Sequence, residues 1–495
     1  METACNSGCH RMTSPSGNWP QTNDGELKMG IFRFRFAALA CVAGLALAAT
    51  ANAQSSTRSI AAPAAPAYSV PAAPAHSAAP ATADYGSVIY DSAPQSYGTS
   101  YFDAAPASTC TSCQSDRALG SRLSNIGNCG GCGLGSRIGG LRECNLGDQW
   151  RLFKPRCDEP RYNIGGWAQI GYAEENNDLF FDNEDNFNLH QLWFYAEKIA
   201  RPSENGGLGF GWRFDAVFGT DADDTQAFGN TTTPGGRIRG FDNNFATGDD
   251  YGWALPQLYG EIAAENWSVK VGHFYTLVGY EVVTAPDNFF FSHAMTQFLS
   301  EPFTHTGAIG TFNVSDDLTL YAGWTLGWDT GFDQFADGSS FLGGFSTSVA
   351  ENSTLTYIST IGDFGFRGSD AYSHSIVVDT QVTDNFNWVV QSDLVRVGST
   401  GEDNVGLNQY FLYSLSDCWG LGSRIEWWKG DTLTGYAPHG GVLPASGSHS
   451  YYGATFGVNY KPHANITVRP EYRVDWSPAL GYDEGYFAVD LIAAF

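Results

Sequence analysis

The sequence has few charged residues and few methionines, and little of its charge is basic. Charged side chains make up 16% of the 495 residues, and 26 Lys and Arg stand against 52 Asp and Glu. The net charge of −26 argues against nucleic acid as a partner, because proteins that bind it need a basic face. With only four Met and few Lys, the composition also argues against a helical bundle.

Long apolar runs are missing as well. Beyond the N-terminal region, no stretch reaches the roughly 18 consecutive apolar residues that a membrane-spanning helix needs. Glycine (58 residues) and aromatic side chains (14%) are plentiful instead. Apolar and polar residues alternate in a transmembrane β-barrel, so its mean hydropathy is moderate. The value of −0.22 found for this chain is compatible with such a barrel.

Residues 1–53 carry the features of an export signal. Basic residues precede an apolar run over 36–49, and Ala51-Asn52-Ala53 follows it. A charged start, an apolar stretch of this length and an A-x-A site predict a signal peptide that is cleaved after Ala53. Because a signal normally begins near its initiator, Met29 is the expected true start. We therefore expect an exported protein.

Two segments of biased composition follow the expected cleavage site. Residues 54–108 consist mainly of Ala, Pro and Ser, a composition that cannot bury a core and predicts a disordered periplasmic linker. Residues 109–157 are rich in Cys and Gly. This second segment is short for a plug domain, although it could partly fill the pore of a barrel.

Four cysteines of the Cys/Gly-rich segment have the spacing of a zinc site. Cys110 with Cys113 and Cys129 with Cys132 form two C-x-x-C pairs that are 15 residues apart. Four thiolates could coordinate zinc tetrahedrally. Disulfides are the default in an exported chain, and loosely constrained thiols are the third interpretation.

One more disulfide is expected at the periplasmic rim of the barrel. Cleavage after Ala53 leaves seven cysteines, and Cys418 lies far downstream of the others, in a predicted tight turn. Cys144 and Cys157 lie between the C-x-x-C pairs and the first predicted strand. We expect Cys157 to pair with Cys418.

From residue 161 onward, apolar residues alternate with small or charged ones, which is the pattern of β-strands with one apolar face. In the stretch 208–218, Phe210, Trp212 and Phe214 face one way, and Gly211, Arg213 and Asp215 face the other. The stretch 466–476 alternates in the same manner and places Arg469, Glu471 and Arg473 on the inner face. Pro470 interrupts this second stretch, and we expect a β-bulge there, because proline weakens a strand ladder.

The pattern repeats about sixteen times. The strands are expected near 162–173, 187–199, 207–219, 254–264, 267–279, 307–314, 318–328, 340–348, 354–362, 373–383, 386–397, 406–415, 419–429, 450–460, 465–476 and 485–495. Short turns alternate with long connections, which is the outer-membrane arrangement with the short turns in the periplasm. The predicted fold is all-β: a transmembrane antiparallel up-and-down β-barrel over 158–495, with a disordered N-terminal Ala/Pro-rich and Cys-rich extension.

The last predicted strand carries a further sign of the outer membrane. Phe487, Val489, Leu491, Ala493 and Phe495 fall on one face of the strand. A terminal Phe after alternating apolar residues resembles the assembly signal of bacterial outer-membrane proteins. We therefore expect outer-membrane lipids and the barrel assembly machinery as partners, the latter through Phe495.

The region 158–495 resembles the β-barrel porins of the OmpL-like type (porin family 2), which are common in planctomycete-like bacteria. The resemblance rests on Gly165-Gly-Trp167, Gly272-His-Phe-Tyr275, Gly279-Tyr-Glu281, Ala285-Pro-Asp-Asn-Phe-Phe-Phe-Ser-His293 and Glu301-Pro-Phe-Thr-His-Thr-Gly307. It implies an outer-membrane channel whose solutes are poorly defined. The Cys-rich segment is not part of the resemblance.

The connection 280–306 is unusually aromatic for a surface loop, and we expect it to fold into the lumen as a constriction. Sixteen strands leave an aqueous channel, whose charged rings would set its selectivity. The expected pore-lining residues are Arg213, Asp215, Glu281, Asp287, Glu301, Arg424, Glu426, Arg469, Glu471 and Arg473. The alternative is that Arg424 with Glu426, and Arg469 with Glu471, only form charged networks on the lumen wall.

No motif indicates catalysis, a cofactor or a metal within the barrel. His273, His293 and His305 lack metal-ligand spacing, and no nucleophile motif surrounds them. The acidic clusters 182–185 and 221–224 lack the full calcium-loop pattern, so solvated loops are the expected interpretation. We do not expect an enzyme.

The expected function is passive diffusion of small hydrophilic solutes or ions through the outer membrane. Acidic composition suggests a preference for cations, which lumen arginines could reverse locally. A homotrimer is expected by analogy with other sixteen-stranded porins. The alternative is a structural or adhesive outer-membrane barrel with a plugged pore and partner-binding extracellular loops.

Overall fold

The computed structural model describes residues 144–153, 162–175, 177, 179–181, 183–202, 206–229, 241–242, 251–431 and 448–495. All of them belong to one compact unit, Ala83–Phe495. The expected signal peptide, the linker 54–108 and the two C-x-x-C pairs lie outside the described residues. They remain predictions.

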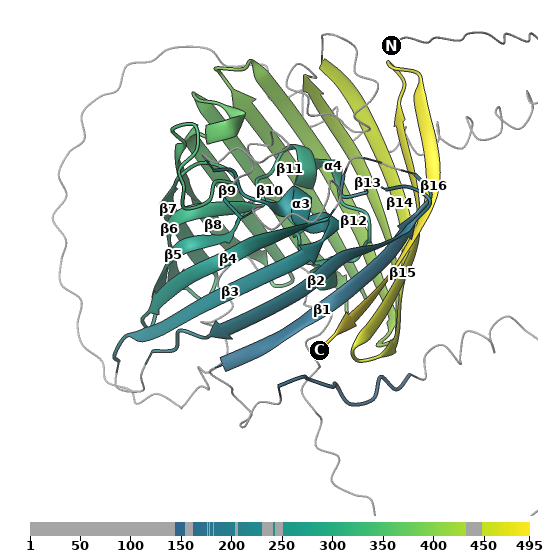
Figure 1. Ribbon diagram of the computed structural model, residues 1–495, viewed down its shortest axis with the longest axis horizontal. Coiled ribbons are helices and arrows are strands. Elements are labelled where there is room, and N and C mark those ends of the chain that lie inside the picture. Colours follow the sequence, from purple (N-terminus) through teal and green to yellow (C-terminus); the bar gives the residue numbers. More distant parts are fainter. Residues whose placement is uncertain are drawn as a thin grey trace, which may run out of the picture. The chain divides into compact units, whose positions relative to one another are not determined.

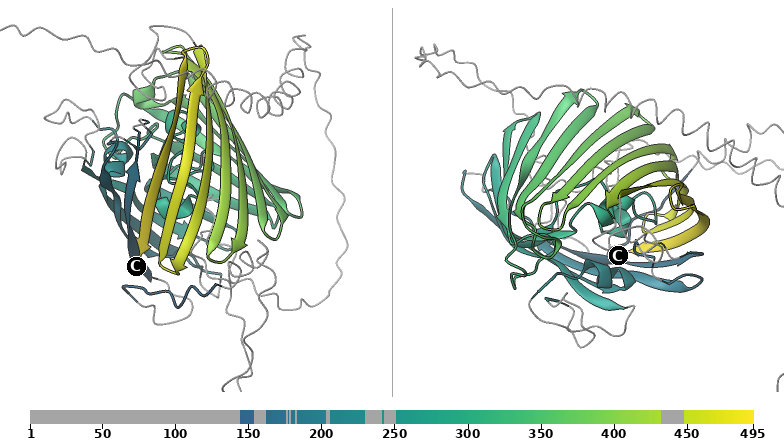
Figure 2. Two further views of the ribbon diagram at one scale, coloured as in Figure 1. Left: turned by 90° about the vertical axis from the view of Figure 1, so that its right-hand side faces the viewer. Right: turned by 90° about the horizontal axis from the view of Figure 1, so that it is seen from above.

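Sixteen antiparallel strands close into a single barrel (Figures 1 and 2). They are β1 Tyr162–Ala173, β2 Phe187–Lys198, β3 Gly209–Gly219, β4 Gly252–Ala263, β5 Trp267–Tyr275, β6 Thr304–Ser315, β7 Leu318–Thr325, β8 Ser339–Ala350, β9 Ser353–Asp363, β10 Ala371–Thr383, β11 Phe386–Val397, β12 Glu402–Ser416, β13 Trp419–Asp431, β14 Ser448–His463, β15 Ile466–Ser477 and β16 Tyr482–Ala494. Each strand pairs with its neighbours in sequence, and β1 pairs with β16. The predicted fold class and strand number are therefore confirmed.

The two ends of the chain's barrel meet where the sequence analysis placed the closing strand. Residues 167–173 of β1 lie opposite residues 494–488 of β16. The ladder extends to the last residue: Phe495 N–H donates to Gly166 O (2.8 Å), and Gly166 N–H donates to Phe495 O (3.0 Å). The terminal Phe therefore completes the pairing of the first and last strands.

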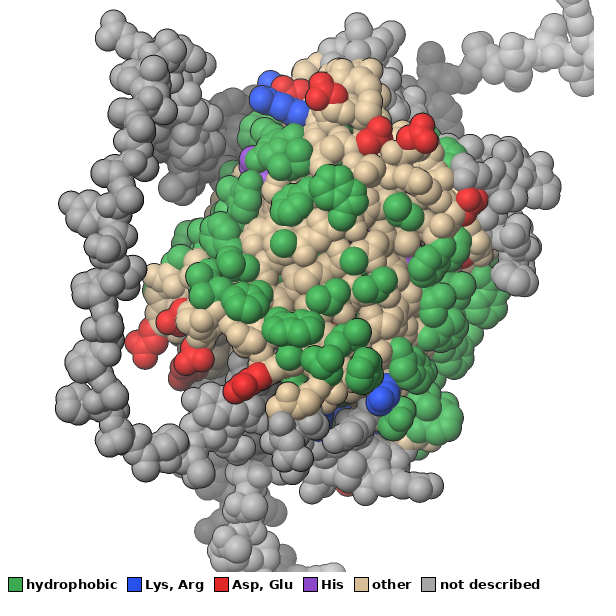
Figure 3. Space-filling view, turned by 90° about the vertical axis from the view of Figure 1, so that its left-hand side faces the viewer, with side chains coloured by type: hydrophobic (Ala, Val, Ile, Leu, Met, Phe, Trp, Pro, Cys, Tyr) green, Lys and Arg blue, Asp and Glu red, His purple; other side chains and the backbone are tan. Residues whose placement is uncertain are grey.

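The outward faces of the strands are apolar, and the inward faces are polar or tightly packed. On β3, Phe210, Trp212 and Phe214 are exposed, whereas Asp215 is buried. In Figure 3, hydrophobic side chains spread over the outer wall, and acidic side chains gather toward its ends. This is the surface that a lipid bilayer requires of a barrel. Among the described residues, no helix is both long and apolar enough to cross a membrane.

The connections at the two ends of the barrel differ in length. At one end, called here the short-turn end, six of the seven turns have two or three residues, and 199–208 is the exception. The long-loop end carries α3 (Thr220–Thr225), η2 (Ala285–Asp287), α4 (Met295–Leu299) and η3 (Gly365–Arg367). Two connections at this end were expected to be longer than they are, because β12 already begins at Glu402 and β16 at Tyr482.

The bulge expected at Pro470 is absent, so this prediction was wrong. On the β16 side, Arg469, Pro470 and Glu471 face Asp490, Val489 and Ala488 in an unbroken register. On the β14 side, the pairing passes from Gly457–Glu471 to Tyr460–Val468 without a shift. The ladder therefore skips the positions beside the proline, which has no N–H to donate, and resumes in the same register. The nearest shift lies between Tyr460 and His463.

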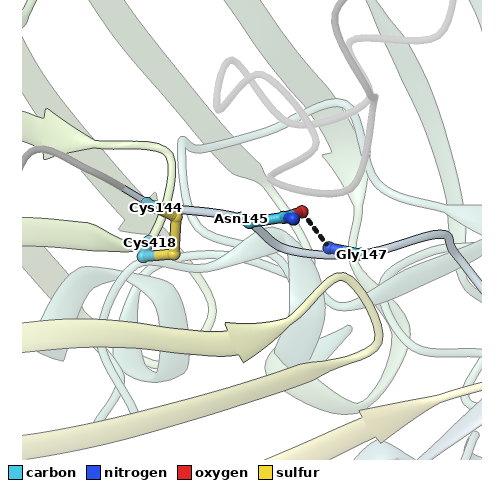
Figure 4. The surroundings of a disulfide bond; sticks show 4 residues. All are labelled: Cys144, Asn145, Gly147 and Cys418. Carbon is cyan, nitrogen blue, oxygen red and sulfur yellow. Dashed lines mark hydrogen bonds between the residues drawn. A yellow bond between two sulfur atoms is a disulfide. The ribbon is translucent and has the colours of Figure 1, made fainter. Parts of the chain in front are cut away.

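A disulfide ties the segment before the barrel to the short-turn end, but its partner is not the expected one. Cys418, in the turn between β12 and β13, pairs with Cys144 (Figure 4). The pairing of Cys157 with Cys418 was therefore wrong. Their Cα atoms are 5.9 Å apart, within the ordinary range for a disulfide.

The segment 144–153 then continues to the next turn along the same rim. Ala464 N–H donates to Leu146 O (2.9 Å). The Asn465 side chain holds Trp150 by both its backbone groups, accepting from N–H (2.7 Å) and donating to O (2.6 Å). These hydrogen bonds hold the segment that carries Cys144 along the rim where Cys418 lies, whereas Cys157 lies outside the described residues. The position of the bonded stretch, which the sequence does not reveal, decides the pairing.

Peptide mapping without reduction tests the Cys144–Cys418 disulfide. We expect a cross-linked peptide that contains Cys144 and Cys418, because the segment 144–153, called here the strap, is held at the rim where Cys418 lies. The Cys157→Ser variant should keep this peptide, and Cys144→Ser should lose it. A peptide that joins Cys157 to Cys418 in the native chain would contradict the assignment.

Candidate functional site

The connection between β5 and β6, residues 276–303, lies inside the barrel and is the candidate site. It includes η2 and α4, and α4 lies within the ring of strands beside β12 and β13 (Figures 1 and 2). Strand β5 ends at Tyr275, four residues earlier than expected, and the chain then turns inward. Gly279 has φ +93°, and a Cβ there would collide with the Glu301 carboxylate. The turn therefore needs glycine.

The backbone of this segment is irregular and buried, so its polar groups need partners. Arg469, from the inner face of β15, supplies three. Its Nη1 donates to Ala285 O (2.9 Å), Asn288 O (2.7 Å) and Phe290 O (2.9 Å). Its Nε pairs with Asp490 Oδ1 of β16 (2.9 Å). One wall side chain thus binds three carbonyls within the six-residue stretch 285–290 of the segment.

Arg424 of β13 and Arg473 of β15 bind the next turn of the segment. Arg424 donates to Ser292 O (2.7 Å) and to His293 O (3.2 Å). Arg473 donates to His293 O at 2.6 Å. Both guanidinium groups are completely buried, so they hold the segment from beneath and do not face open solvent.

Carboxylates on the same wall accept the N–H groups of the segment. Glu471 accepts from Phe291 (2.8 Å) and from Ser292 (3.0 Å). Glu426 accepts from Met295 at 2.7 Å. Arginines and carboxylates therefore alternate on the inner faces of β13 and β15, and they satisfy carbonyl and N–H groups in turn. We call Arg424, Glu426, Arg469, Glu471 and Arg473 the charged ladder.

Glu281 joins the segment itself to the ladder. Its Oε1 lies 2.7 Å from Arg424 Nη1, and its Oε2 accepts from Ala294 N–H (2.7 Å). Burial would raise the pKa of the Glu281 carboxyl, but the Arg424 guanidinium and nearby His293 lower this pKa to about 2. Glu281 is thus ionised at neutral pH and completes a buried ion pair between segment and wall.

Three consecutive phenylalanines sit on three inward-facing glycines of the wall. A Cβ added at Gly422 of β13 would lie 2.4 Å from the ring of Phe289. At Gly457 of β14 it would lie 3.1 Å from Phe290, and at Gly171 of β1 2.3 Å from Phe291. Any larger residue would push these rings out of place.

Apolar contacts join the segment to the other sectors of the wall. Leu277 and Val278 pack against a cluster from β6 to β9, and Phe289 and Phe290 against residues of β10 to β12. Met295 and Leu299 pack against Trp428 and Tyr451. Val283 and Phe303 belong to a cluster from β1 to β4. The segment therefore meets the barrel wall on every side.

Glu301 anchors the last part of the segment in a different manner. Gln391 of β11 donates one amide group to both Glu301 Oε1 (2.5 Å) and Asp393 Oδ2 (2.7 Å). Burial and the neighbouring Asp393 carboxyl raise the pKa of Glu301 well above its usual range. Burial therefore favours the neutral form of the Glu301 carboxyl until a positive group comes close to it.

The remaining expected pore-lining residues lie elsewhere. Arg213 pairs with Asp215 (2.7 Å) and with Glu197 (3.2 Å) on β2 and β3, apart from the charged ladder. Asp287 accepts from Thr284 at 2.6 Å, within η2. The Arg424–Glu426 pair is present (2.7 Å). Arg469 pairs with Asp490 instead of Glu471, because Asp490 lies directly opposite it on β16.

Several residues of the site were not singled out from the sequence. Gln191 of β2 donates to Val283 O (2.7 Å) and accepts from Ala285 N–H (3.1 Å). Gln391 and the glycines Gly171, Gly422 and Gly457 were missed as well. The sequence pattern that could have indicated these residues is their position on the inward faces of the alternating strands. Most other residues on those faces are larger than glycine or charged.

The described residues contain no cluster of three or more His, Cys, Asp or Glu side chains that could hold a metal ion. His293 Nδ1 lies 3.7 Å from Glu281 Oε2, and His305 lies beside Thr276 and the Gly327 carbonyl. These contacts fix the segment and its neighbours. The four C-x-x-C cysteines lie outside the described residues, and their metal or disulfide state stays a prediction.

Comparisons with known proteins agree with the barrel. The model of the family described as "Putative beta-barrel porin-2, OmpL-like" matches residues 161–493. A search of curated protein sequences gives no significant match.

The chain also has matches among solved structures of outer-membrane proteins. OmpT of Vibrio cholerae, in its trimer form, is 10% identical with a TM-score of 0.43, and the match covers 68% of this chain and 99% of that one. The outer membrane channel DcaP of Acinetobacter baumannii is 13% identical with a TM-score of 0.43, covering 68% and 97%. A mutant of Rh. blastica porin is 14% identical with a TM-score of 0.43, covering 68% and 100%.

Removing a charge of the ladder should destabilise the whole barrel. Arg469→Met leaves Asp490 buried without its charged partner and removes a donor from three carbonyls, so we expect a loss of about 3–5 kcal/mol in the free energy of unfolding. Denaturant titration in lipid vesicles, followed by tryptophan fluorescence, measures it. The matched control is Arg396→Met, whose pair with Asp403 is exposed and should contribute at most about 1 kcal/mol. Equal losses in the two variants would contradict the role of Arg469.

The contacts of the three phenylalanine rings with the glycines of the wall, called here the phenylalanine seats, can be tested by a double-mutant cycle. Gly422→Val should cost about 1–3 kcal/mol of stability, because the new side chain displaces the Phe289 ring. In a Phe289→Ala background the same substitution should cost much less, since the ring is gone. Gly260→Val is the control, because nothing lies within 4 Å of a Cβ at Gly260. Additive effects of Gly422→Val and Phe289→Ala would refute the contact.

Proposed function

Because this chain belongs to the family of OmpL-like β-barrel porins, we propose that it passes small hydrophilic solutes or ions through the outer membrane by passive diffusion. The closed barrel and its apolar outer wall fit a channel protein of that membrane. The family match, over residues 161–493, covers all sixteen strands except the last residue of β16. A channel of this kind needs no catalytic group, because its shape and charge determine what passes.

The observation that carries the proposal is the segment 276–303 inside the barrel. A sixteen-stranded barrel without an inward segment would be a wide aqueous channel. Here the charged ladder and the three phenylalanine seats hold the segment against the wall. We infer that it narrows the channel to a constriction, which restricts passage to small solutes.

The charge around the segment supports a preference for cations. Three guanidinium groups, those of Arg424, Arg469 and Arg473, lie among five carboxylates. These are Glu281, Glu426, Glu471, Asp475 and Asp490, each in contact with the ladder or the segment. Each of the three arginines has a carboxylate partner, so the excess carboxylates would attract cations.

The remaining features of the proposal follow from the barrel's orientation. We infer that the short-turn end faces the periplasm, so that the disulfide strap and the exported N-terminal extension lie there. We also propose that Phe495 serves the assembly machinery and that the barrel forms homotrimers. Cross-linking in native membranes would test the oligomeric state.

One observation favours a second candidate function. The segment 276–303 meets the wall on every side, which would also suit a plugged structural or adhesive barrel whose long loops bind a partner. Conductance separates the two candidates, because a plugged barrel carries no steady current.

Single-channel recording of the refolded full-length protein in a planar bilayer tests the proposed function. We expect stable ohmic steps and, under a salt gradient, a reversal potential whose sign indicates cation preference. Deletion of residues 284–300 should raise the conductance severalfold, since it removes the constriction. Silence from a verified folded barrel would favour the plugged alternative. Unchanged conductance in the deletion would refute the constriction.

A further inference from the structure

A small cavity lies among four connections at the long-loop end of the barrel. Its lining comes from the connections after β3, β5, β7 and β9. The lining residues are Phe228, Phe298, Glu301, Phe303, Trp328, Asp329, Phe366 and Arg367. The empty space is about 440 Å³, open solvent at its mouth included. Phe366, with 41% of its surface exposed, is the most accessible of these residues.

The cavity wall is mainly aromatic. Phe228 stacks on Phe366 with ring centroids 4.4 Å apart. Phe298 meets Phe303 edge to face at 5.7 Å, and Trp328 completes the set. Trp328 is already stacked on Phe364 (4.4 Å) and has Arg367 over its ring. The rings that remain for a ligand are therefore those of the four phenylalanines, whose negative quadrupole attracts a cation.

The cavity wall already contains one positively charged group, the side chain of Arg367. The Arg367 guanidinium lies 5.1 Å from the Trp328 ring, and its Nε donates to both carboxylate oxygens of Glu402 (3.0 and 3.1 Å). A further Arg367 hydrogen bond reaches the Leu299 carbonyl. Glu402 balances the positive charge of Arg367, so this arginine does not make the cavity a site for anions.

Two more carboxyl groups line the cavity. Glu301 is 4% exposed and contacts Gln391 of β11, as described above. Asp329 accepts from Phe303 N–H (2.7 Å) and Thr304 N–H (3.0 Å), which fixes it at the end of the segment 276–303. With the Arg367–Glu402 pair neutral, the acidic groups that remain in the lining favour a positive ligand.

We propose that this cavity binds the alkylammonium head group of an organic cation. The aromatic rings contact the methyl groups of the cation, Asp329 supplies the opposite charge, and Glu301 gives up its proton when the cation binds beside it. An inorganic cation would gain less here, because its hydration shell would have to give way to ring carbons instead of oxygen ligands.

The proposed cation site adds a substrate class to the proposed channel function, and its role in transport rests on that function. Glu301 and Phe303 belong to the segment that forms the proposed constriction, so a cation in the cavity lies next to the narrowest part of the channel. The chain would then select organic cations among the small solutes. Binding itself, however, does not require that the channel conducts.

Equilibrium binding of choline tests the proposal. Isothermal titration of the refolded full-length protein with choline chloride, in a buffer whose ionic strength is held constant with NaCl, should give saturable binding. The uncharged isostere 3,3-dimethylbutan-1-ol should not compete, because it has the same shape without the charge. Competition by this alcohol at equal concentration would overturn the role of charge.

Two pairs of variants assign the binding to this cavity. Phe366→Leu should weaken choline binding about fivefold, which corresponds to one cation–π contact. Phe332→Leu is its control, because Phe332 is similarly exposed at 49% but does not line the cavity. Glu301→Gln should also weaken binding about fivefold. Asp403→Asn, on the exposed rim, is the control for charge. Equal affinities in a variant and its control would overturn the assignment.

Conductance measurements separate this inference from the proposed function. Choline should reduce the current of the native channel reversibly, and less so in Phe366→Leu. A channel that conducts ions but does not bind choline would overturn the inference and leave the porin function standing. A protein that binds choline but is silent in the bilayer would support the cavity and refute passive diffusion.

Discussion

An irregular backbone buried inside a barrel must find a partner for each N–H and each C=O, and the rest of this structure depends on how that is achieved. Strands satisfy their own groups, but the segment 276–303 has no ladder of its own. Side chains of the barrel wall take the place of the missing strand hydrogen bonds. Arg469 binds three of its carbonyls, and Glu471 accepts two of its N–H groups. A single lost contact would leave a buried polar group without a partner.

This requirement explains the composition of the inner wall. The charged residues stand on β13 and β15, on either side of β14, and they meet successive backbone groups of the segment. Glycines stand where the phenylalanine rings of the segment touch the wall. The charges of the ladder alternate in sign, so that neighbouring charges compensate one another. Buried ion pairs are stable in a low-dielectric environment only when hydrogen bonds satisfy their remaining polar atoms. The position of the segment, and with it the shape of the channel, follows from the wall and not from the segment alone.

The sequence predicts the barrel well, because strand alternation is a local property. Residues 162–173 and 386–397 were assigned to strands with the bounds that the structure has, and the face of each charged residue on β15 was correct. Partners across strands depend on register, which alternation does not determine. The alternative interpretation grouped Arg469 with Glu471 of its own strand, whereas Asp490 lies opposite it. In the same way Cys157 was chosen over Cys144, because nothing local shows which part of the segment before β1 follows the rim. The prediction of a bulge at Pro470 was wrong because a pair of strands can omit a hydrogen bond without shifting register.

The inward position of the segment 276–303 was predicted from its aromatic content, but its contacts were not, since they arise from five or more strands that are distant in the sequence. Hydrogen–deuterium exchange of the full-length protein in lipid vesicles tests the central claim most directly. If the wall carboxylates, together with Glu281 of the segment, hold the backbone, the N–H groups of Phe291, Ser292, Ala294 and Met295 should exchange as slowly as those of the neighbouring strands. Exchange of these four groups at the rate of an unstructured peptide would contradict the account.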